Sequence, residues 1–255
     1  MTLDNPVANK FSIAASHYKQ HDVLQRITAK QLLDNAPLFG TLLDVGAGPG
    51  TSFNACNDVE QVVAVDIAHG MLKQLSKQHP DYLPICCDAQ ALGLQSAAID
   101  SIYSNLALQW CQKLPQAFVE FHRVLRPSGE CHLSVVVDGS LAELKTLGFR
   151  VNQFNSVSAI KAAFMASQDS PNDWLNIDIQ VKSISVYFDD LRSLLYSIKG
   201  VGASFAQQGE NNATHHHHPL TKQQWQQRIA LAETMRTDKG IPLTYQIAYI
   251  RAKRG

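Results

Sequence analysis

Apolar and polar positions follow two patterns along this chain: short aliphatic runs and longer stretches with helical spacing. Within the first 138 residues we expect five apolar runs to form buried strands, at residues 41–45, 61–66, 83–88, 99–110 and 129–137. Residues 68–79 and 116–126 have helical spacing, and residues 51–58 could open a helix. Strands rich in Val, Ile and Leu with helices between them predict a parallel sheet covered on both faces.

The pattern changes after residue 138. Helices are expected at 139–154, at 156–166, at 189–200, where Gly200 ends the helix, and at 221–236, where Thr221 caps it. Strands are expected at 177–188 and 243–254. We interpret residues 1–255 as a single domain. Residues 139–220 are expected to be an insertion near the open end of the sheet, between a first half at 1–138 and a final helix and strand at 221–255 that return to the core.

Composition narrows the class of protein. With 255 residues and 45% hydrophobic content the chain can bury a full core, and its 22 basic and 22 acidic residues create no net field toward nucleic acid or a charged membrane. The N-terminus lacks the apolar run of a signal peptide, and no stretch approaches a membrane span. Five cysteines without C-x-x-C spacing suit reduced thiols. We therefore expect a cytoplasmic globular protein that binds neither nucleic acid nor membrane.

A glycine-rich loop follows the first expected strand, in the segment LLDVGAGPGTSF. Gly46, Gly48 and Gly50 can take positive φ and let a ligand approach the main chain without an intervening Cβ. Dinucleotide-binding loops have the spacing G-x-G-x-x-G, whereas here an acid, Asp44, precedes three glycines that alternate with other residues. This spacing disfavours a nicotinamide dehydrogenase.

Two further acids end the next two apolar runs. Asp66 is placed to accept hydrogen bonds from the two ribose hydroxyls of an adenosyl ligand, and Asp88 could meet an adenine amine. Acids at these positions also cap helices. Their combination with Asp44 and the glycine loop favours a nucleoside-containing cofactor.

The segments DVGAGPG, VVAVDIA, CCDAQAL and RVLRPSGE resemble the class I S-adenosylmethionine-dependent methyltransferases. Six further segments resemble one family within that class, the malonyl-acyl-carrier-protein O-methyltransferases of biotin synthesis: AASHYKQHDVLQR, SNLALQWC, GSLAEL, YFDD, IKGVGA and PLTYQ. The resemblance implies a Rossmann-like α/β fold with a seven-stranded sheet, helices on both faces and an inserted lid region of helices and a strand. Residues 1–138 would then be the cofactor-binding half and residues 139–220 the acceptor side.

The resemblance also implies a reaction. The methyl group of S-adenosylmethionine would pass to the free carboxylate of a malonyl thioester, on acyl carrier protein or coenzyme A. The products would be S-adenosylhomocysteine and the methyl ester that primes pimeloyl synthesis for biotin. A carboxylate with a pKa of roughly 4 is already ionised at neutral pH, so no general base is required. Two alternatives stay open: methylation of another small acid or a quinone, and a non-catalytic protein that only binds the cofactor.

Site residues follow from the resemblance and from these positions. The expected cofactor-binding residues are Asp44, Gly46, Ala47, Gly48, Gly50, Asp66, Ile67, Met71, Asp88, Ala89 and Asn105. The expected substrate-binding residues are Tyr18, Asn105, Gln109, Trp110, Lys199 and Tyr245, and no metal site is expected.

Several of these positions have a second interpretation. Lys199 binds the acceptor carboxylate or only caps a helix C-terminus, and Trp110 faces the acceptor or belongs to the core. Tyr196 stands where some family members carry an arginine. The run His215–His218 is typical of a solvated loop rather than of a metal site.

Overall fold

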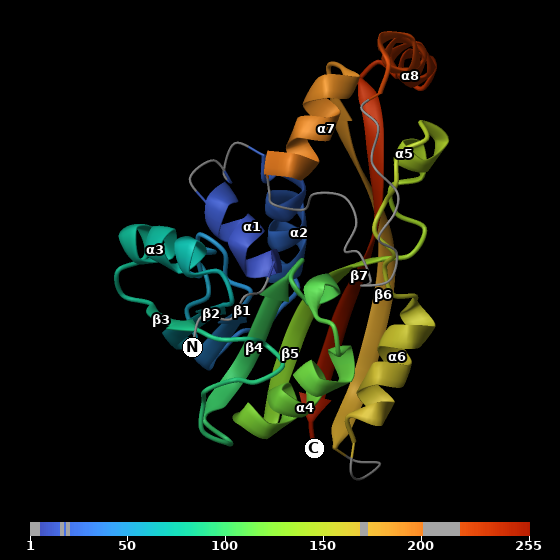
Figure 1. The fold of residues 1–255 in the computed structure, drawn as a ribbon. Helices are drawn as coiled ribbons and strands as arrows, with labels where there is room; N and C mark the ends of the chain where they lie inside the picture. The colour runs from blue at the N-terminus through green and yellow to red at the C-terminus, as the bar shows by residue number, and fades with distance from the viewer. Residues whose placement is uncertain (1–5, 16–17, 19–20, 169–172, 201–219) are drawn as a thin grey trace.

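The computed structural model describes residues 6–15, 18, 21–168, 173–200 and 220–255, which form a seven-stranded sheet with helices around it (Figure 1). The strands are β1 (Gly40–Val45), β2 (Val59–Asp66), β3 (Leu83–Cys86), β4 (Ile99–Asn105), β5 (Leu125–Val137), β6 (Trp174–Phe188) and β7 (Ile241–Arg254). Their order is β3-β2-β1-β4-β5-β7-β6. Only β7 runs antiparallel to its neighbours among these strands. The expected α/β fold is confirmed.

Helices cover both faces of the sheet, as expected. They are α1 (Pro6–Ala14), α2 (Val23–Leu33), α3 (His69–Gln78), α4 (Leu114–Val124), α5 (Ala142–Thr146), α6 (Val157–Ala166), α7 (Leu191–Gly200) and α8 (Lys222–Thr234). Successive residues of β1 point to opposite faces, so Leu43 joins a core cluster with Phe118 of α4 while Leu42 packs in a cluster with Leu75 of α3. A strand buried on both faces explains the continuous apolar run in the sequence.

Three expected elements differ in extent. Residues 51–58 form turns instead of a helix, because the Tyr82 hydroxyl bonds to this segment: it accepts from the Phe53 amide and donates to the Thr51 carbonyl, both at 3.1 Å. The helix expected at 139–154 is limited to the five residues of α5. It ends in a Schellman motif with Gly148 at φ +74°, where the amides of Gly148 and Phe149 bond back into the helix. The strand expected at 99–110 ends at Asn105.

The strand expected inside an insertion at 139–220 belongs to the central sheet. It lies within β6, which pairs with β7 along its length from Trp174 to Phe188, and Ile177 and Ile179 pack against the main core cluster. Helix α6 packs on α4 over the same face. Strand β6 therefore completes the sheet and α6 covers one of its faces, whereas α5 and α7 lie outside the sheet.

Helices α5, α7 and α8 gather at one end of the long antiparallel pair β6–β7, at the top of Figure 1. Their buried residues form a separate cluster with the first residues of β7; it includes Leu144, Leu194, Ala232 and Leu243. Since β6 is parallel to β5, the carboxyl end of β6 lies at the same edge of the sheet as the carboxyl ends of β1, β2 and β4. These three helices, here called the extension, therefore stand at the same edge of the sheet as the glycine loop.

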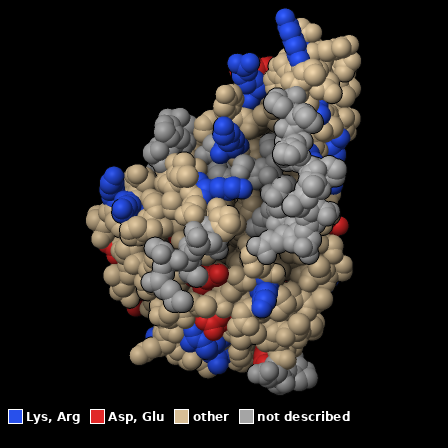
Figure 2. All heavy atoms as spheres, viewed as in Figure 1, with Lys and Arg blue, Asp and Glu red and all other residues tan. Residues whose placement is uncertain are grey.

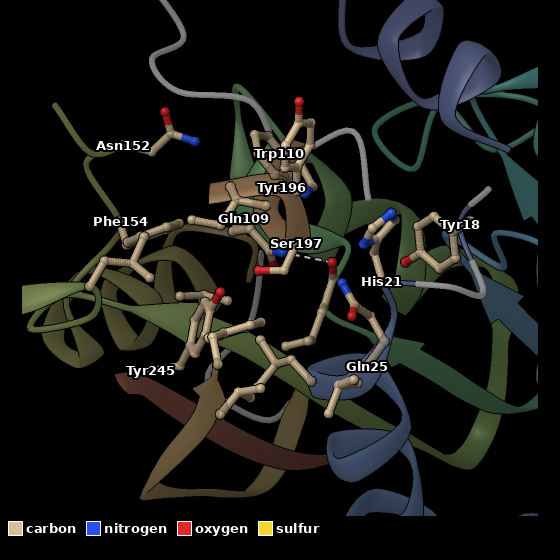
Figure 3. Close-up of a pocket in the computed structure, with 18 of the residues that line it drawn as sticks. Tyr18, His21, Gln25, Gln109, Trp110, Asn152, Phe154, Tyr196, Ser197 and Tyr245 are labelled. Carbon is tan, nitrogen blue, oxygen red and sulfur yellow. Dashed lines mark hydrogen bonds between the residues drawn. The ribbon is translucent and has the colours of Figure 1, made fainter. Parts of the chain in front are cut away.

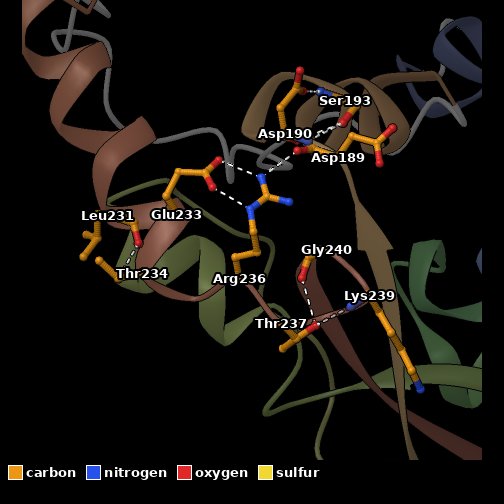
Figure 4. Close-up of polar contacts among 10 residues, drawn as sticks. All are labelled: Asp189, Asp190, Ser193, Leu231, Glu233, Thr234, Arg236, Thr237, Lys239 and Gly240. Atoms are coloured by element: carbon orange, nitrogen blue, oxygen red, sulfur yellow. Dashed lines mark hydrogen bonds and ion pairs between the residues drawn. The ribbon is translucent and has the colours of Figure 1, made fainter.

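A hydrogen-bonded cluster fixes the start of α7 (Figure 4). Arg236, just after α8, donates to the Asp189 carbonyl at 2.7 Å and to the Glu233 carboxylate at 2.6 Å. Asp190 accepts from the amide of Ser193 at 2.6 Å, and this bond lowers the pKa of the Asp190 carboxyl. One side chain thus joins α8 to the turn from which α7 begins.

The stacked ring pair between α4 and α6 offers a test of the core. Phe118 and Phe164 are fully buried, with ring centroids 3.8 Å apart. We expect Phe118→Ala to lower the free energy of unfolding by about 3–5 kcal/mol, the usual cost of removing a buried ring. Val119→Ala, at an exposed position of the same helix, is the matched control and should cost less than about 1 kcal/mol in urea denaturation. Equal losses in the two variants would contradict this packing.

Candidate active site

The loop after β1 passes directly under the carboxyl end of β2. The amides of Gly46 and Ala47 donate to the Val65 carbonyl at 2.8 and 3.0 Å. Gly46 has φ +69°, and a Cβ there would overlap the Cβ of Ala107. Gly48 has φ +56°, and a Cβ there would project into open space with no atom within 4 Å. Glycine at 46 thus permits close packing, and glycine at 48 keeps a space clear beside the backbone.

Asp66, the last residue of β2, fixes the other side of this loop. One carboxylate oxygen accepts from the Gly48 amide at 2.8 Å and the other from the Ala68 amide at 2.7 Å. Burial raises the pKa of Asp66 to about 6, although both amide hydrogen bonds oppose the rise. Each oxygen keeps a further lone pair with which it can accept a bond from a ligand.

A cavity of about 180 Å³ lies beside this loop. Most of the predicted cofactor residues line it, namely Gly46, Gly48, Asp66, Ile67, Met71, Asp88, Ala89 and Asn105. The parallel strands bring these residues together because their carboxyl ends meet at one edge of the sheet. Asp88 follows β3 by two residues and accepts from the Gln90 amide at 2.9 Å.

Three predicted cofactor residues do not line this cavity: Asp44, Ala47 and Gly50. Asp44 is 1% exposed, and one of its oxygens accepts no hydrogen bond from any described residue. Burial raises the pKa of Asp44 well above its usual range, and the nearby Asp66 raises it further. Asp44 is therefore a buried residue outside the cavity wall.

A second, larger cavity of about 480 Å³ lies between the N-terminal helices and the extension (Figure 3). Four of its residues line both cavities: Phe11, Tyr18, Leu106 and Trp110. The rings of Phe11 and Trp110 meet edge to face at 5.5 Å between centroids. The two cavities therefore adjoin at an aromatic wall.

The predicted substrate residues do not all lie in the same cavity. Tyr18, Gln109, Trp110 and Tyr245 line the larger cavity. Asn105 lines the smaller one, where its amide bonds to the Gln25 carbonyl and accepts from the Ser134 hydroxyl. Lys199 is exposed near the end of α7 and lines neither cavity, because the helix turns Ser193, Tyr196 and Ser197 toward the cavity instead.

Sequence reasoning missed the residues that α2 and the loop after α5 bring to the larger cavity. They are His21, Leu24, Gln25, Asn152 and Phe154. His21, Leu24 and Gln25 lie within the segment AASHYKQHDVLQR that resembles the family, whereas Asn152 and Phe154, more than 100 residues further along the chain, belong to no quoted segment. The run His215–His218 lies outside the described residues.

The described residues bear on metal binding, membrane crossing and the reactivity of cysteines. In the described ranges, no group of three His, Cys, Asp or Glu side chains is placed to hold a metal ion. None of the helices seen in those ranges has the length and apolar character needed to cross a bilayer. All five cysteines are unpaired, and burial raises the pKa of Cys111, which lines the smaller cavity, to about 12. That thiol is therefore not ionised at neutral pH.

The fold is that of methyltransferases. Residues 43–133 match the methyltransferase domain family. The fold is similar to that of the YcgJ protein of Bacillus subtilis (TM-score 0.60, 16% identity, 90% of this chain and 98% of that one). A putative methyltransferase of Bacillus halodurans is also similar (TM-score 0.59, 14% identity, 88% and 97%). The chain is a class I S-adenosylmethionine-dependent methyltransferase.

Sequence similarity then defines the family. The malonyl-[acyl-carrier protein] O-methyltransferase of Enterobacter lignolyticus is 33% identical over 244 residues, which cover 94% of each chain. The biotin biosynthesis bifunctional protein BioHC of Cellvibrio japonicus is 34% identical over 252 residues. That match covers 96% of this chain and 49% of the relative, so this chain spans about half of the bifunctional protein. The chain belongs to the malonyl-[acyl-carrier protein] O-methyltransferase family, which confirms the resemblance noted in the sequence.

The raised pKa of Asp66 predicts how stability depends on pH. The unfolded chain has an ordinary Asp pKa near 3.9, so between about pH 4 and 6 the native state binds the extra proton, and stability falls as pH rises through 6. Asp66→Asn should remove this component. We expect its stability relative to the parent to improve from about pH 5 to about pH 7.5 in urea denaturation without ligand. Parallel pH profiles for the two proteins would contradict the raised pKa.

Proposed function

We propose that this chain transfers the methyl group of S-adenosylmethionine to the free carboxylate of a malonyl group carried as a thioester on acyl carrier protein. The observation that carries the proposal is the pair of adjoining cavities, one beside the glycine loop and Asp66, the other apolar and large. The names of the relatives, which specify malonyl-[acyl-carrier protein] and biotin biosynthesis, support this acceptor and a role in that pathway.

The smaller cavity suits the cofactor on two grounds. Asp66 offers two oxygens with free lone pairs, which would accept from ribose hydroxyls, and the space above Gly48 leaves room for a ligand against the backbone. Asp88 and Ala89 would border the adenine, and Ile67 and Met71 would supply apolar contact. Bound there, S-adenosylmethionine supplies an electrophilic methyl group on a sulfonium.

The chain's own task would then be alignment. A malonyl carboxylate is ionised at neutral pH and needs no base to become a nucleophile. The aromatic wall of Phe11, Tyr18 and Trp110 would exclude water and hold the carboxylate oxygen in line with the reacting carbon. Positioning of this kind can supply about 7–11 kcal/mol of the barrier reduction. Tyr245 and Gln109 would orient the rest of the acceptor.

Positive charge that could attract an acidic carrier is spread over the surface (Figure 2). In Figure 2 the lysine and arginine side chains on the face shown stand in separate groups rather than in one continuous patch. Exposed Arg192 and Lys199 of α7 would offer positive charge near the larger cavity. An acidic carrier would therefore meet scattered cations.

Methyl transfer from labelled S-adenosylmethionine tests the proposed reaction. We expect transfer to malonyl-acyl carrier protein and to malonyl thioesters of coenzyme A and N-acetylcysteamine, with base-labile methyl esters as products. Acetyl thioesters, which lack the free carboxylate, are the matched control and should accept no label. Equal transfer to unrelated small acids or a quinone, or no transfer at all, would contradict the proposal.

The cofactor site has its own test. Asp66→Ala should weaken S-adenosylmethionine binding by about 1.5–3 kcal/mol in calorimetry, the usual worth of hydrogen bonds to a charged group. The exposed Asp81→Ala is the matched control and should bind the cofactor like the parent. Unchanged affinity in a folded Asp66→Ala protein would remove Asp66 from the site.

A further inference from the structure

The larger cavity poses a charge problem for an anionic acceptor. Among the described residues that line it, none is Lys, Arg, Asp or Glu. A carboxylate that leaves water for an apolar cavity loses several kcal/mol of solvation unless a charge or several donors meet it. Among the described lining residues, the group that meets it would be one of the neutral polar side chains or the histidine.

His21 is the single lining residue in the described part of the chain that can carry a positive charge. Its amide donates to the Tyr18 carbonyl at 3.0 Å, so a tight turn holds the two residues together. Figure 3 shows the imidazole beside Tyr18 and above Gln25, on the cavity side where the shared residue Tyr18 lies.

The surroundings of His21 leave its ring available. Asp22, the next residue, is buried and already accepts from Arg26 Nε at 2.8 Å. The imidazole itself makes no side-chain hydrogen bond or ion pair with another residue in the described ranges.

We propose that His21 is the cationic partner of the acceptor carboxylate and that the Tyr18 hydroxyl donates a second bond to it. This inference rests on the proposed function, since it assumes an anionic acceptor in the larger cavity. It replaces Lys199 in that role, because Lys199 is exposed and lines neither cavity.

A single histidine in place of several strong cations also suits the chemistry. Methyl transfer neutralises the carboxylate, so a cation bound to it stabilises the substrate more than the transition state. His21 should therefore contribute to binding and selectivity rather than to the chemical step. A cluster of arginines would hold the substrate more tightly and slow the transfer.

Binding of an acid and its neutral ester tests this inference directly. With S-adenosylhomocysteine present, the parent should bind the malonyl thioester of N-acetylcysteamine at least about tenfold more tightly than its methyl ester. His21→Gln should reduce that ratio to near unity, and His21→Lys should restore much of it. The matched control His69→Gln, at an exposed position of α3, should keep the parent's ratio. Affinity for S-adenosylhomocysteine should be unchanged in all variants.

Kinetics add a second measurement. His21→Gln should raise KM for the malonyl thioester about tenfold or more and change kcat by less than about threefold. An unchanged acid-to-ester ratio in folded His21→Gln would overturn the inference, as would loss of the ratio in Lys199→Met instead. Failure of the proposed function would appear in the parent itself, as binding of neither acid nor ester, and would overturn both proposals.

Discussion

The hydrogen bond from the Gly48 amide to the Asp66 carboxylate is the contact on which the rest of the site depends. It joins the loop after β1 to the end of β2 at 2.8 Å, and both residues line the smaller cavity. The bond is possible because both strands end at the same edge of a parallel sheet. Glycine at positions 46 and 48 is the consequence, since a side chain there would meet Ala107 or fill the cavity.

The two cavities differ in charge as well as in size. Asp66 and Asp88 line the smaller one, which favours a cationic ligand, while no described lining residue of the larger one is an acid. A cationic methyl donor and an anionic acceptor would thus be held apart until they meet at the wall formed by Phe11, Tyr18 and Trp110.

The sequence predicted those strands, caps and loops that depend on residues close together in the chain. The apolar runs of β1, β2 and β5, the capping box of α8 at Thr221 and the loop glycines depend on residues close together in the chain. The helix expected at 51–58 is absent because Tyr82, from outside that segment, supplies its hydrogen bonds. The strand at 177–188 was expected in an insertion because its pairing with β7 is not visible in sequence.

The sequence by itself determined the class of fold, the glycine loop and the acids at the strand ends, because period, composition and spacing encode these directly. Tertiary structure decided which residues line the larger cavity. It left Lys199 exposed to the solvent. It brought His21 from the turn before α2, Asn152 from the loop after α5 and Tyr245 from strand β7 to one cavity. Such a wall is set by how separate elements pack, and no local pattern of residues records that packing.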